Sequence, residues 1–358
     1  HDMGLIGMLF QPLFVGNPCI LMSPVSFLQR PIRWLQAITR YRATTSGGPN
    51  FAYDMCVDRI REKDCEGLDL SSLEIAYSGA EPIRETTLAR FTERFAPYGF
   101  RREAFYPCYG LAESTLLVTG GKKLSPLRIR EVDAGVLETD HRAEAATRDA
   151  PARSLIGCGT SPEGQRVRIV DPETCVALDD CQVGEIWVSG PCLAAGYWNQ
   201  ESLNQKVFHA KLADDEVSHY LRTGDLGFME DGELYVTGRI KELMIIRGKN
   251  HYPQDIEATA EKSHPALRPA ASAAFLLEDD FPQLVLVHEV ARQHMADPDV
   301  EGIAASIRES VTCGHGLRVS TVILLRPGML PKTSSGKIRR GECKKRLITG
   351  ALPVIGRG

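Results

Sequence analysis

Apolar residues recur in the first part of this chain with the spacings of helices and strands. Between 28 and 42 they return every three or four residues, which predicts an amphipathic helix with one face in the core. Residues 73–77 and 104–108 predict buried strands, and 82–95 predicts a helix with a proline near its start. This alternation of strand and helix favours a layered α/β region.

The pattern changes after residue 121. Residues 122–153 are charged, rich in alanine and weakly patterned, which is typical of an inserted segment. Spaced apolar positions such as Val132 and Val136 favour a packed segment, and an unstructured surface loop is the alternative. From about 154 to 237, short β-type runs are separated by Gly, Pro and Asp, which predicts a small β-barrel-like subdomain.

The last third of the chain has an alternation of its own, and it favours a separate α+β domain. The expected elements are helices over 253–263 and 300–312 and strands over 271–277, 284–290 and 319–325. We therefore divide the chain into an α/β region with the insertion (1–153), a β-rich subdomain (154–238) and a C-terminal α+β domain (239–358).

Composition narrows the class of protein without naming a function. With 358 residues, 43% hydrophobic and 25% charged, the chain is typical of a soluble protein with more than one core. A net charge of -4 gives no broad attraction for nucleic acid or anionic lipid. The ten cysteines are scattered without a C-x-x-C pair, and no apolar run is long enough to cross a bilayer. We expect a cytoplasmic protein with no nucleic-acid partner and no stable membrane insertion.

Candidate chemistry lies in stretches that combine glycine with polar residues between apolar elements, where backbone can approach a ligand closely. They are S-G-A-E-P (78–82), Y-P-C-Y-G-L-A-E-S (106–114), Y-L-R-T-G-D-L (220–226) and L-P-K-T-S-S-G-K-I-R-R (330–340). Each alone could be a turn with a capped helix, and the last could be a plain basic tail. The occurrence of all four stretches in one chain, in this order, is stronger evidence for a binding site than any one stretch alone.

The order and spacing of these motifs resemble the adenylate-forming superfamily of acyl-CoA synthetases, peptide-synthetase adenylation domains and firefly luciferase. The resemblance covers nearly the whole chain and implies activation of a carboxylic acid by ATP. It also implies an adenine site formed by Gly79, Ala80, Glu81, Pro82, Tyr109 and Gly110. In that site the tyrosine ring would stack on the base, although a packed core tyrosine is the alternative for Tyr109 alone.

Further roles follow from the same resemblance. Glu113 matches the acidic residue that helps to hold Mg²⁺ on the ATP phosphates, a suitable task for a carboxylate. The residue before it is Ala112, where the superfamily often has a threonine that contacts the α-phosphate. Asp225 matches the carboxylate that accepts hydrogen bonds from both ribose hydroxyls, and Arg239 is expected to reach the ribose from the other side.

Two lysines complete the implied site. Lys241 matches the hinge between the large N-terminal part and a small mobile C-terminal domain, with a surface lysine as the alternative. Lys337 matches the catalytic lysine, whose ammonium offsets charge between the acyl carboxylate and the α-phosphate. Lys332 lies in the same loop, but the superfamily's lysine follows the glycine turn, which selects Lys337.

Three features are similar to the fatty acyl-AMP ligases: H-D-M-G-L-I-G at the start, G-P-N-F-A-Y-D at 48–54, and the insertion. This branch, known from polyketide and lipopeptide biosynthesis, transfers the acyl group to the phosphopantetheine arm of an acyl carrier protein. The resemblance implies a fatty acid substrate and an acyl pocket containing His1, Gly48, Asn50 and Phe51. A long-chain acyl-CoA synthetase is the alternative.

The resemblance also predicts an incomplete N-terminal domain. T-T-S-G-G-P-N (44–50) imitates a phosphate-binding loop, but it continues into the acyl-pocket motif, and the superfamily's true loop would lie before the H-D-M-G motif. We therefore expect that this chain could be inactive alone. An inactive fragment that binds nucleotide or carrier is the alternative from another class, and acyl length and oligomeric state are not determined.

Overall fold

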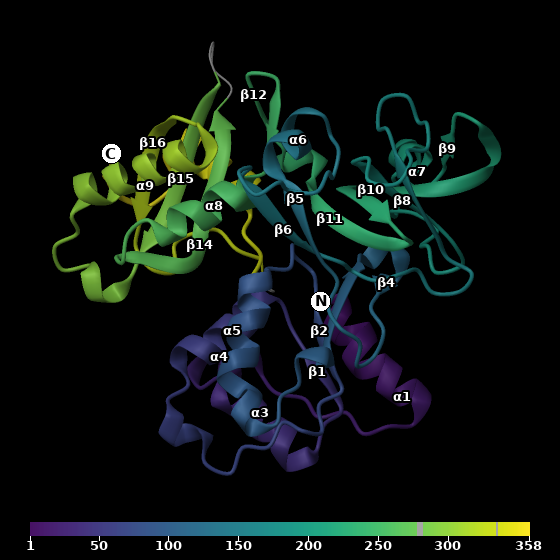
Figure 1. The fold of residues 1–358 in the computed structure, drawn as a ribbon, viewed down its shortest axis with the longest axis horizontal. Helices are drawn as coiled ribbons and strands as arrows, with labels where there is room; N and C mark the ends of the chain where they lie inside the picture. The colour runs from purple at the N-terminus through teal and green to yellow at the C-terminus, as the bar shows by residue number, and fades with distance from the viewer. Residues whose placement is uncertain (278–281, 334–335) are drawn as a thin grey trace. The chain divides into compact units, whose positions relative to one another are not determined.

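The computed structural model describes residues 1–277, 282–333 and 336–358. The chain divides into two compact units, His1–Ile240 and Lys241–Gly358. Figure 1 follows the chain through both units from the N-terminal helices to the C-terminal sheet. No described helix is both long and apolar enough to cross a membrane.

The first unit begins with helices and a mixed sheet. Its strands pair in the order β1-β2-β3-β4, parallel across the first two interfaces and antiparallel across the last. These strands are β1 (Thr45–Gly47), β2 (Ile75–Ser78), β3 (Phe105–Gly110) and β4 (Leu117–Gly120). The helices of this region are η1 (Met3–Phe10, a π-helix), α1 (Gln11–Val15), α2 (Pro24–Gln29), α3 (Ile32–Tyr41), α4 (Asn50–Arg59) and α5 (Glu85–Phe95). Short 3₁₀ turns are η2 (Glu62–Cys65), η3 (Ala96–Tyr98), η4 (Arg102–Ala104) and η5 (Ala112–Ser114).

An aromatic core joins α3, α4 and α5 to this sheet. Tyr53 of α4 contacts Phe91 of α5 and Phe105 of β3, with ring centroids 5.0 and 5.2 Å apart. Figure 1 shows these helices next to β1 and β2. Burial of large rings in edge-to-face contact stabilises this layer and holds the strand ends in place.

The single helix predicted over 28–42 is wrong in its first part. The chain forms two helices, because α2 ends at Gln29 and α3 begins at Ile32. Between them Arg30 is extended, with φ -146° and ψ 89°, as expected for the residue before Pro31. The proline ring cannot continue the helix, so Leu28 belongs to another element and is exposed.

The segment over 122–153 contains a strand and a helix, and a second strand begins at its end. β5 (Ile129–Asp133) and β6 (Ala152–Ile156) form an antiparallel pair, and α6 (Ala134–Thr139) follows β5 directly. Val132 and Leu137 are buried at 0% and 1% exposure. The alternative of an unstructured loop is therefore wrong. Of the two positions on which packing was predicted, Val132 is buried and Val136 is half-buried.

The β-rich region is an open, curled sheet and not a closed barrel among the described residues. Its path is β11-β10-β8-β7, with β9 paired to β10. The strands are β7 (Arg166–Val170), β8 (Gly184–Ser189), β9 (Ala210–Leu212), β10 (Asp215–Glu230) and β11 (Glu233–Arg239), and α7 (Glu201–Val207) precedes β9. The stretch at 220–226 lies inside the long strand β10, so its expected position between elements is wrong.

The second unit is a four-stranded sheet covered on both faces. Its order is β14-β15-β16-β17, and its strands are β14 (Leu267–Leu277), β15 (Gln283–Val290), β16 (Val319–Leu325) and β17 (Val354–Arg357). The remaining elements are η6 (Ile240–Glu242, at the boundary), β12 (Met244–Ile246), β13 (Lys249–His251), α8 (Pro253–Lys262), η7 (Arg292–His294), α9 (Val300–His315) and α10 (Arg340–Ile348).

Alternation along the central strands explains the two covered faces. Leu284 and Leu286 of β15 pack with α8 and α9, whereas Val285 and Val287 pack with Cys343 of α10. The five elements predicted between 253 and 325 are confirmed, with shifts of up to four residues at their ends. The basic-tail alternative for 330–340 is wrong, because an ordered helix and strand follow it.

Candidate active site

The S-G-A-E-P segment turns sharply after β2. A side chain on Gly79 would place its Cβ 2.6 Å from the carbonyl oxygen of Cys108 in the neighbouring strand, so only glycine fits. Ala80 has φ +69°, a left-handed conformation that is unfavourable for a residue with a side chain. Strain of this kind concentrates at ligand-binding turns, which makes this turn a candidate binding site.

Asn50 fastens this turn to the first residue of α4. Its amide nitrogen donates to Oε1 of Glu81 at 3.0 Å and to the carbonyl of Pro82 at 2.9 Å. Its amide oxygen accepts from the backbone NH of Arg84 at 3.0 Å. Asn50 is only 4% exposed, so the structure uses its polar atoms to join two sequence motifs.

Three residues of the predicted nucleotide site meet where β3, β10 and β11 come together. The Tyr109 hydroxyl donates to Oδ2 of Asp225 at 2.8 Å, and Nε of Arg239 donates to Oδ1 at 2.7 Å. Tyr109 and Asp225 are each 8% exposed. Burial, together with the charge of Asp225, raises the pKa of Tyr109 well above its ordinary value, so the hydroxyl keeps its proton.

Glu113 lies in η5, three residues beyond the end of β3. Its Oε1 accepts a hydrogen bond from the Tyr197 hydroxyl at 2.7 Å, and its carbonyl accepts from the NH of Ala194 at 2.8 Å. Burial and the bond to Glu113 raise the pKa of Tyr197 to about 12. Beside it, Thr115 has φ +62° and donates to the carbonyl of Cys192 at 2.7 Å, which also ties η5 to the segment over 192–197.

Sequence reasoning missed Tyr197. It lies in G-Y-W-N at 196–199, an aromatic residue next to a glycine. The same combination selected Tyr109 and Gly110, so the local pattern contained a usable indication. At Gly110, a side chain would place its Cβ 1.8 Å from the carbonyl oxygen of Leu116, which explains the glycine by close backbone packing.

The loop that carries the predicted catalytic lysine belongs to the second unit. The backbone NH of Lys337 donates to Oγ1 of Thr333 at 3.0 Å, and its carbonyl accepts from the NH of Thr333 at 2.8 Å. The two serines of T-S-S-G lie outside the described residues. The Lys332 ammonium donates to the carbonyl of Ala270 at 2.8 Å, so this second lysine is tied to β14.

The other predicted residues occupy simpler positions. Lys241 is exposed and is the first residue of the second unit. His1 is exposed and pairs with Asp2. Gly48 is buried, and its NH donates a hydrogen bond to the carbonyl of Tyr77 at 3.1 Å. Phe51 is half-buried in α4. These observations place the residues without identifying a ligand for them.

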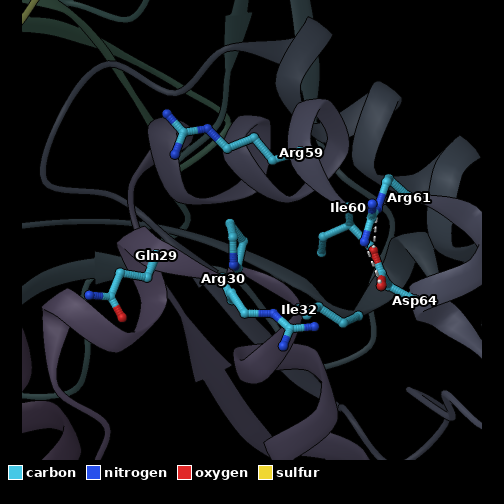
Figure 2. Close-up of a pocket in the computed structure, with 8 residues that line it drawn as sticks. Gln29, Arg30, Ile32, Arg59, Ile60, Arg61 and Asp64 are labelled. Atoms are coloured by element: carbon cyan, nitrogen blue, oxygen red, sulfur yellow. Dashed lines mark hydrogen bonds and ion pairs between the residues drawn. The ribbon is translucent and has the colours of Figure 1, made fainter.

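A surface pocket lies apart from these residues, between the α2–α3 connection and the end of α4. It is lined by Gln29, Arg30, Pro31, Ile32, Arg59, Ile60, Arg61 and Asp64. Figure 2 shows Arg61 directed at Asp64, and Nε of Arg61 lies 2.9 Å from the carboxylate. Because the pocket contains none of the predicted site residues, we assign it no part in the chemistry.

Comparisons with known proteins decide the family. A model described as AMP-binding enzyme matches residues 1–198, and one for the AMP domain of Disco-interacting protein 2-like proteins matches 241–357. The chain belongs to the AMP-binding enzyme family. It is 48% identical over 355 residues to the medium-chain-fatty-acid–acyl-carrier-protein ligase JamA of Moorena producens, covering 98% of this chain and 60% of that protein.

Solved structures of AMP-binding enzymes agree in fold. One from work on the fatty acyl-adenylate ligases of E. coli and L. pneumophila is 34% identical, with TM-score 0.89, and the match covers 98% of this chain and 61% of that one. The L. pneumophila ligase in complex with acyl adenylate and pyrophosphate is 47% identical, with TM-score 0.68 and coverage of 100% and 62%. The predicted resemblance to fatty acyl-AMP ligases is confirmed, and the chain spans about 60% of the length of these relatives.

AMP-binding enzymes use ATP, and the residues at Asp225 suit its sugar. An ionised carboxylate has about four lone-pair positions on its two oxygens. Tyr109 and Arg239 occupy one position on each oxygen of Asp225, so each oxygen can still accept a hydroxyl. The buried Asp225 carboxylate, its charge balanced by Arg239, therefore has acceptor positions that fit the two hydroxyls of a ribose.

The described residues fit a divalent cation less closely than they fit a ribose. The described ranges contain no group of three or more His, Cys, Asp or Glu side chains with ligating geometry. Mg²⁺ is commonly held by one or two carboxylates together with substrate phosphates. Glu113 accepts one bond from Tyr197 and keeps further lone pairs, so its carboxylate fits that second mode.

Proposed function

We propose that this protein activates a fatty acid with ATP, forming an acyl-adenylate and pyrophosphate, and passes the acyl group to the phosphopantetheine thiol of an acyl carrier protein. The observation that carries the proposal is the buried Asp225 carboxylate between Tyr109 and Arg239, with acceptor capacity left for a ribose. Family membership and a relative named as a fatty-acid–carrier-protein ligase support the substrate class.

The nucleotide would be bound entirely by the first unit. The turn over 79–82 and the Tyr109–Gly110 backbone would hold the adenine, and Asp225 with Arg239 would hold the ribose. Two observations support this role: Gly79 lies too close to Cys108 of β3 for a side chain, and Ala80 has a strained, left-handed backbone. The geometry is preorganised, since Asn50 fixes the turn from α4.

In the first half-reaction, an oxygen of the fatty carboxylate attacks the α-phosphorus of ATP, and the bond to the bridging oxygen of pyrophosphate breaks. Lys337 would stabilise negative charge on the reacting groups with its ammonium. Glu113 would hold Mg²⁺, which neutralises the phosphates when it is bound. The protein's contribution is therefore orientation and charge stabilisation and not covalent chemistry.

In the second half-reaction, the carrier thiol attacks the acyl carbonyl, and the carbon–oxygen bond to AMP breaks. We assign Lys241 as the hinge about which residues 241–358 turn between the two steps. The division of the chain between Ile240 and Lys241 supports this assignment. Turning would withdraw Lys337 after adenylation, when its charge is no longer required.

Separate assays of the two half-reactions test this proposal. Lys337→Ala should reduce fatty-acid-dependent adenylate formation by about 100-fold or more, while thioester formation from supplied acyl-adenylate stays close to wild type. Lys332→Ala is the matched comparison in the same loop. Lys332 anchors the loop to Ala270 and is not proposed to contact the reacting groups. Its loss should therefore reduce adenylate formation less than the loss of Lys337. Equal losses in both half-reactions for Lys337→Ala would reject the assignment.

The acceptor distinguishes the proposal from an acyl-CoA synthetase. The ordered segment formed by β5, α6 and β6 supports the carrier-protein branch, because that branch is the one expected to contain it. Equal concentrations of coenzyme A and a phosphopantetheinylated carrier should yield acyl-carrier product almost exclusively. Efficient acyl-CoA formation would identify a synthetase instead.

A further inference from the structure

The strand that carries Asp225 is interrupted by a bulge. β10 pairs with β8 at Arg222↔Trp187 and pairs again at Leu226↔Glu185. Three residues on β10, Thr223 to Asp225, therefore face a single residue, Ile186, on β8. Gly224 is at the centre with φ +71°. A bulge of this kind redirects side chains relative to the neighbouring strand, here β8. Asp225 keeps its pairing with Arg239 of β11, and its carboxylate bonds both Arg239 and Tyr109.

A buried carboxylate of β8 bonds the backbone of the bulge. Glu185 is 2% exposed, and its Oε1 accepts from the NH of Gly224 at 3.0 Å. Its Oε2 accepts from Nε of Arg222 at 2.8 Å and from the indole NH of Trp187 at 2.9 Å. Nη2 of Arg222 also lies 2.7 Å from Oε2. Glu185 thus receives donors from side chains of both strands and from the NH of Gly224, the residue directly before Asp225.

The side chains of Thr223 and Arg222 make further contacts within the bulge and with β8. The Thr223 hydroxyl donates to the carbonyl of Ile186 at 2.7 Å and accepts from the NH of Asp225 at 3.1 Å. The guanidinium of Arg222 lies over the Trp187 ring, 5.2 Å from its centroid. With the peptides on both sides of Gly224 bonded, this network holds the backbone before Asp225 on the β8 side, while Asp225 itself pairs with Arg239 of β11 on the other side.

We propose that Glu185 is a positioning residue for the nucleotide sugar: it fixes the bulge so that the Asp225 carboxylate meets both ribose hydroxyls. This inference rests on the proposed nucleotide site. Only an acceptor suits the position, because every group directed at the Glu185 carboxylate is a donor. Glutamine would turn an NH₂ group toward at least one of these donors and release the bulge while changing little volume.

Equilibrium binding of AMP, 2′-deoxy-AMP and 3′-deoxy-AMP to the whole chain provides the test. Wild type should bind AMP about tenfold or more tightly than either deoxynucleotide, since a hydroxyl bond to a carboxylate is lost. Glu185→Gln should reduce this preference by at least about threefold. A role in stability alone would weaken all three ligands by the same factor and leave the preference unchanged, which would overturn the inference.

Glu233→Gln is the matched control. Glu233 is also a buried carboxylate of this sheet, at 8% exposure, and accepts from the NH of Gly159 at 2.7 Å, away from the bulge. Its substitution should leave the preference for AMP unchanged. A wild-type chain that binds none of the nucleotides contradicts the proposed function, whereas discrimination that survives Glu185→Gln contradicts only the role of Glu185.

A second pair of variants decides the case if Glu185→Gln does not fold. Gly224→Ala adds a methyl group to a left-handed residue in the bulge, and Gly232→Ala does the same in the turn between β10 and β11. Neither new Cβ would have an atom within 4 Å, so both variants impose backbone strain only. Only Gly224→Ala should reduce the preference for AMP, and an unchanged preference would overturn the inference.

Discussion

Buried polar residues of this protein hold particular segments of backbone in place. Asn50 bonds the turn at 81–84, Glu185 bonds the bulge before Asp225, and Glu289 accepts from the NH of Leu330 at 2.8 Å. Burying such groups is unfavourable unless they are bonded, so each site penalises other arrangements of the same segment. The buried polar atoms of these residues are therefore used to position backbone, including those of Asn50, which the sequence placed in the acyl pocket.

His288 predicts a pH-dependent stability of the second unit. It is fully buried in β15, and burial lowers its pKa from 6.5 to about 4. Between these values the unfolded chain binds a proton that the folded chain does not, so stability is full above pH 6.5 and falls as pH drops toward 4. The expected loss from this residue at pH 5 is about 2 kcal/mol.

Urea unfolding followed by circular dichroism at pH 7 and pH 5 measures this loss. Other groups also titrate in this range, so the informative quantity is the difference between wild type and His288→Gln. The variant cannot take up the proton and should lose about 2 kcal/mol less stability than wild type on acidification. An identical loss in both proteins would contradict a neutral, buried His288.

At the scale of elements, the stretch over 330–340, which leads into α10, is anchored at both ends by buried acids. Glu289 accepts from the NH of Leu330, and Arg340, the first residue of α10, binds Glu257 of α8 through Nε and Nη2, both at 2.7 Å. Nη1 of Arg340 also donates to Glu242 at 2.6 Å. The loop with Lys337 thus has fixed ends within its own unit.

Arg340→Met should lower the free energy of unfolding by about 3 kcal/mol, because Glu257 would remain buried without its cation. Glu257 is 2% exposed. Arg346→Met on the same helix is the control, since its pair with Glu342 is largely solvated and should contribute about 0.5 kcal/mol or less. Urea unfolding of both variants checks this, and similar losses would show that the buried pair is unimportant.

At the scale of the whole molecule, each core cluster described here draws its residues from one unit. The clusters around Leu286 and around Val287 lie entirely within 241–358, and the cluster around Phe91 lies within the first unit. A unit with a complete core of its own satisfies the main requirement for folding independently.

We therefore expect residues 241–358 to fold when produced alone. Thermal unfolding followed by circular dichroism should be cooperative, and amide exchange should protect β14, β15 and β16 most strongly. Val285→Ala, which leaves a cavity in the same core, is the control for specific packing. It should lower the midpoint temperature of unfolding. A chain that unfolds without a transition would show that the second unit depends on the first.

Short-range patterns predicted the elements whose periodicity is strong. The buried positions of α3, including Leu35 and Ile38, and the apolar run of β16 were correctly placed because their faces repeat with the period of one element. The pattern failed where a long-range partner decides the conformation. β10 pairs with three other strands, and its glycine and aspartate, typical of turns, occur within a strand because the bulge is bonded by β8.

The sequence by itself determined the order of the motifs, the family they indicate, and the identity of residues such as Asp225, Glu113 and Lys337. Only the tertiary structure decided which of them meet. Asp225 and Tyr109 are 116 residues apart, and Tyr197 and Glu113 are 84 apart. A hydrogen bond between such distant residues depends on strand pairing and register, which no local spacing encodes. The partners of Tyr197, and the role of Glu185, could therefore be recognised only in the folded protein.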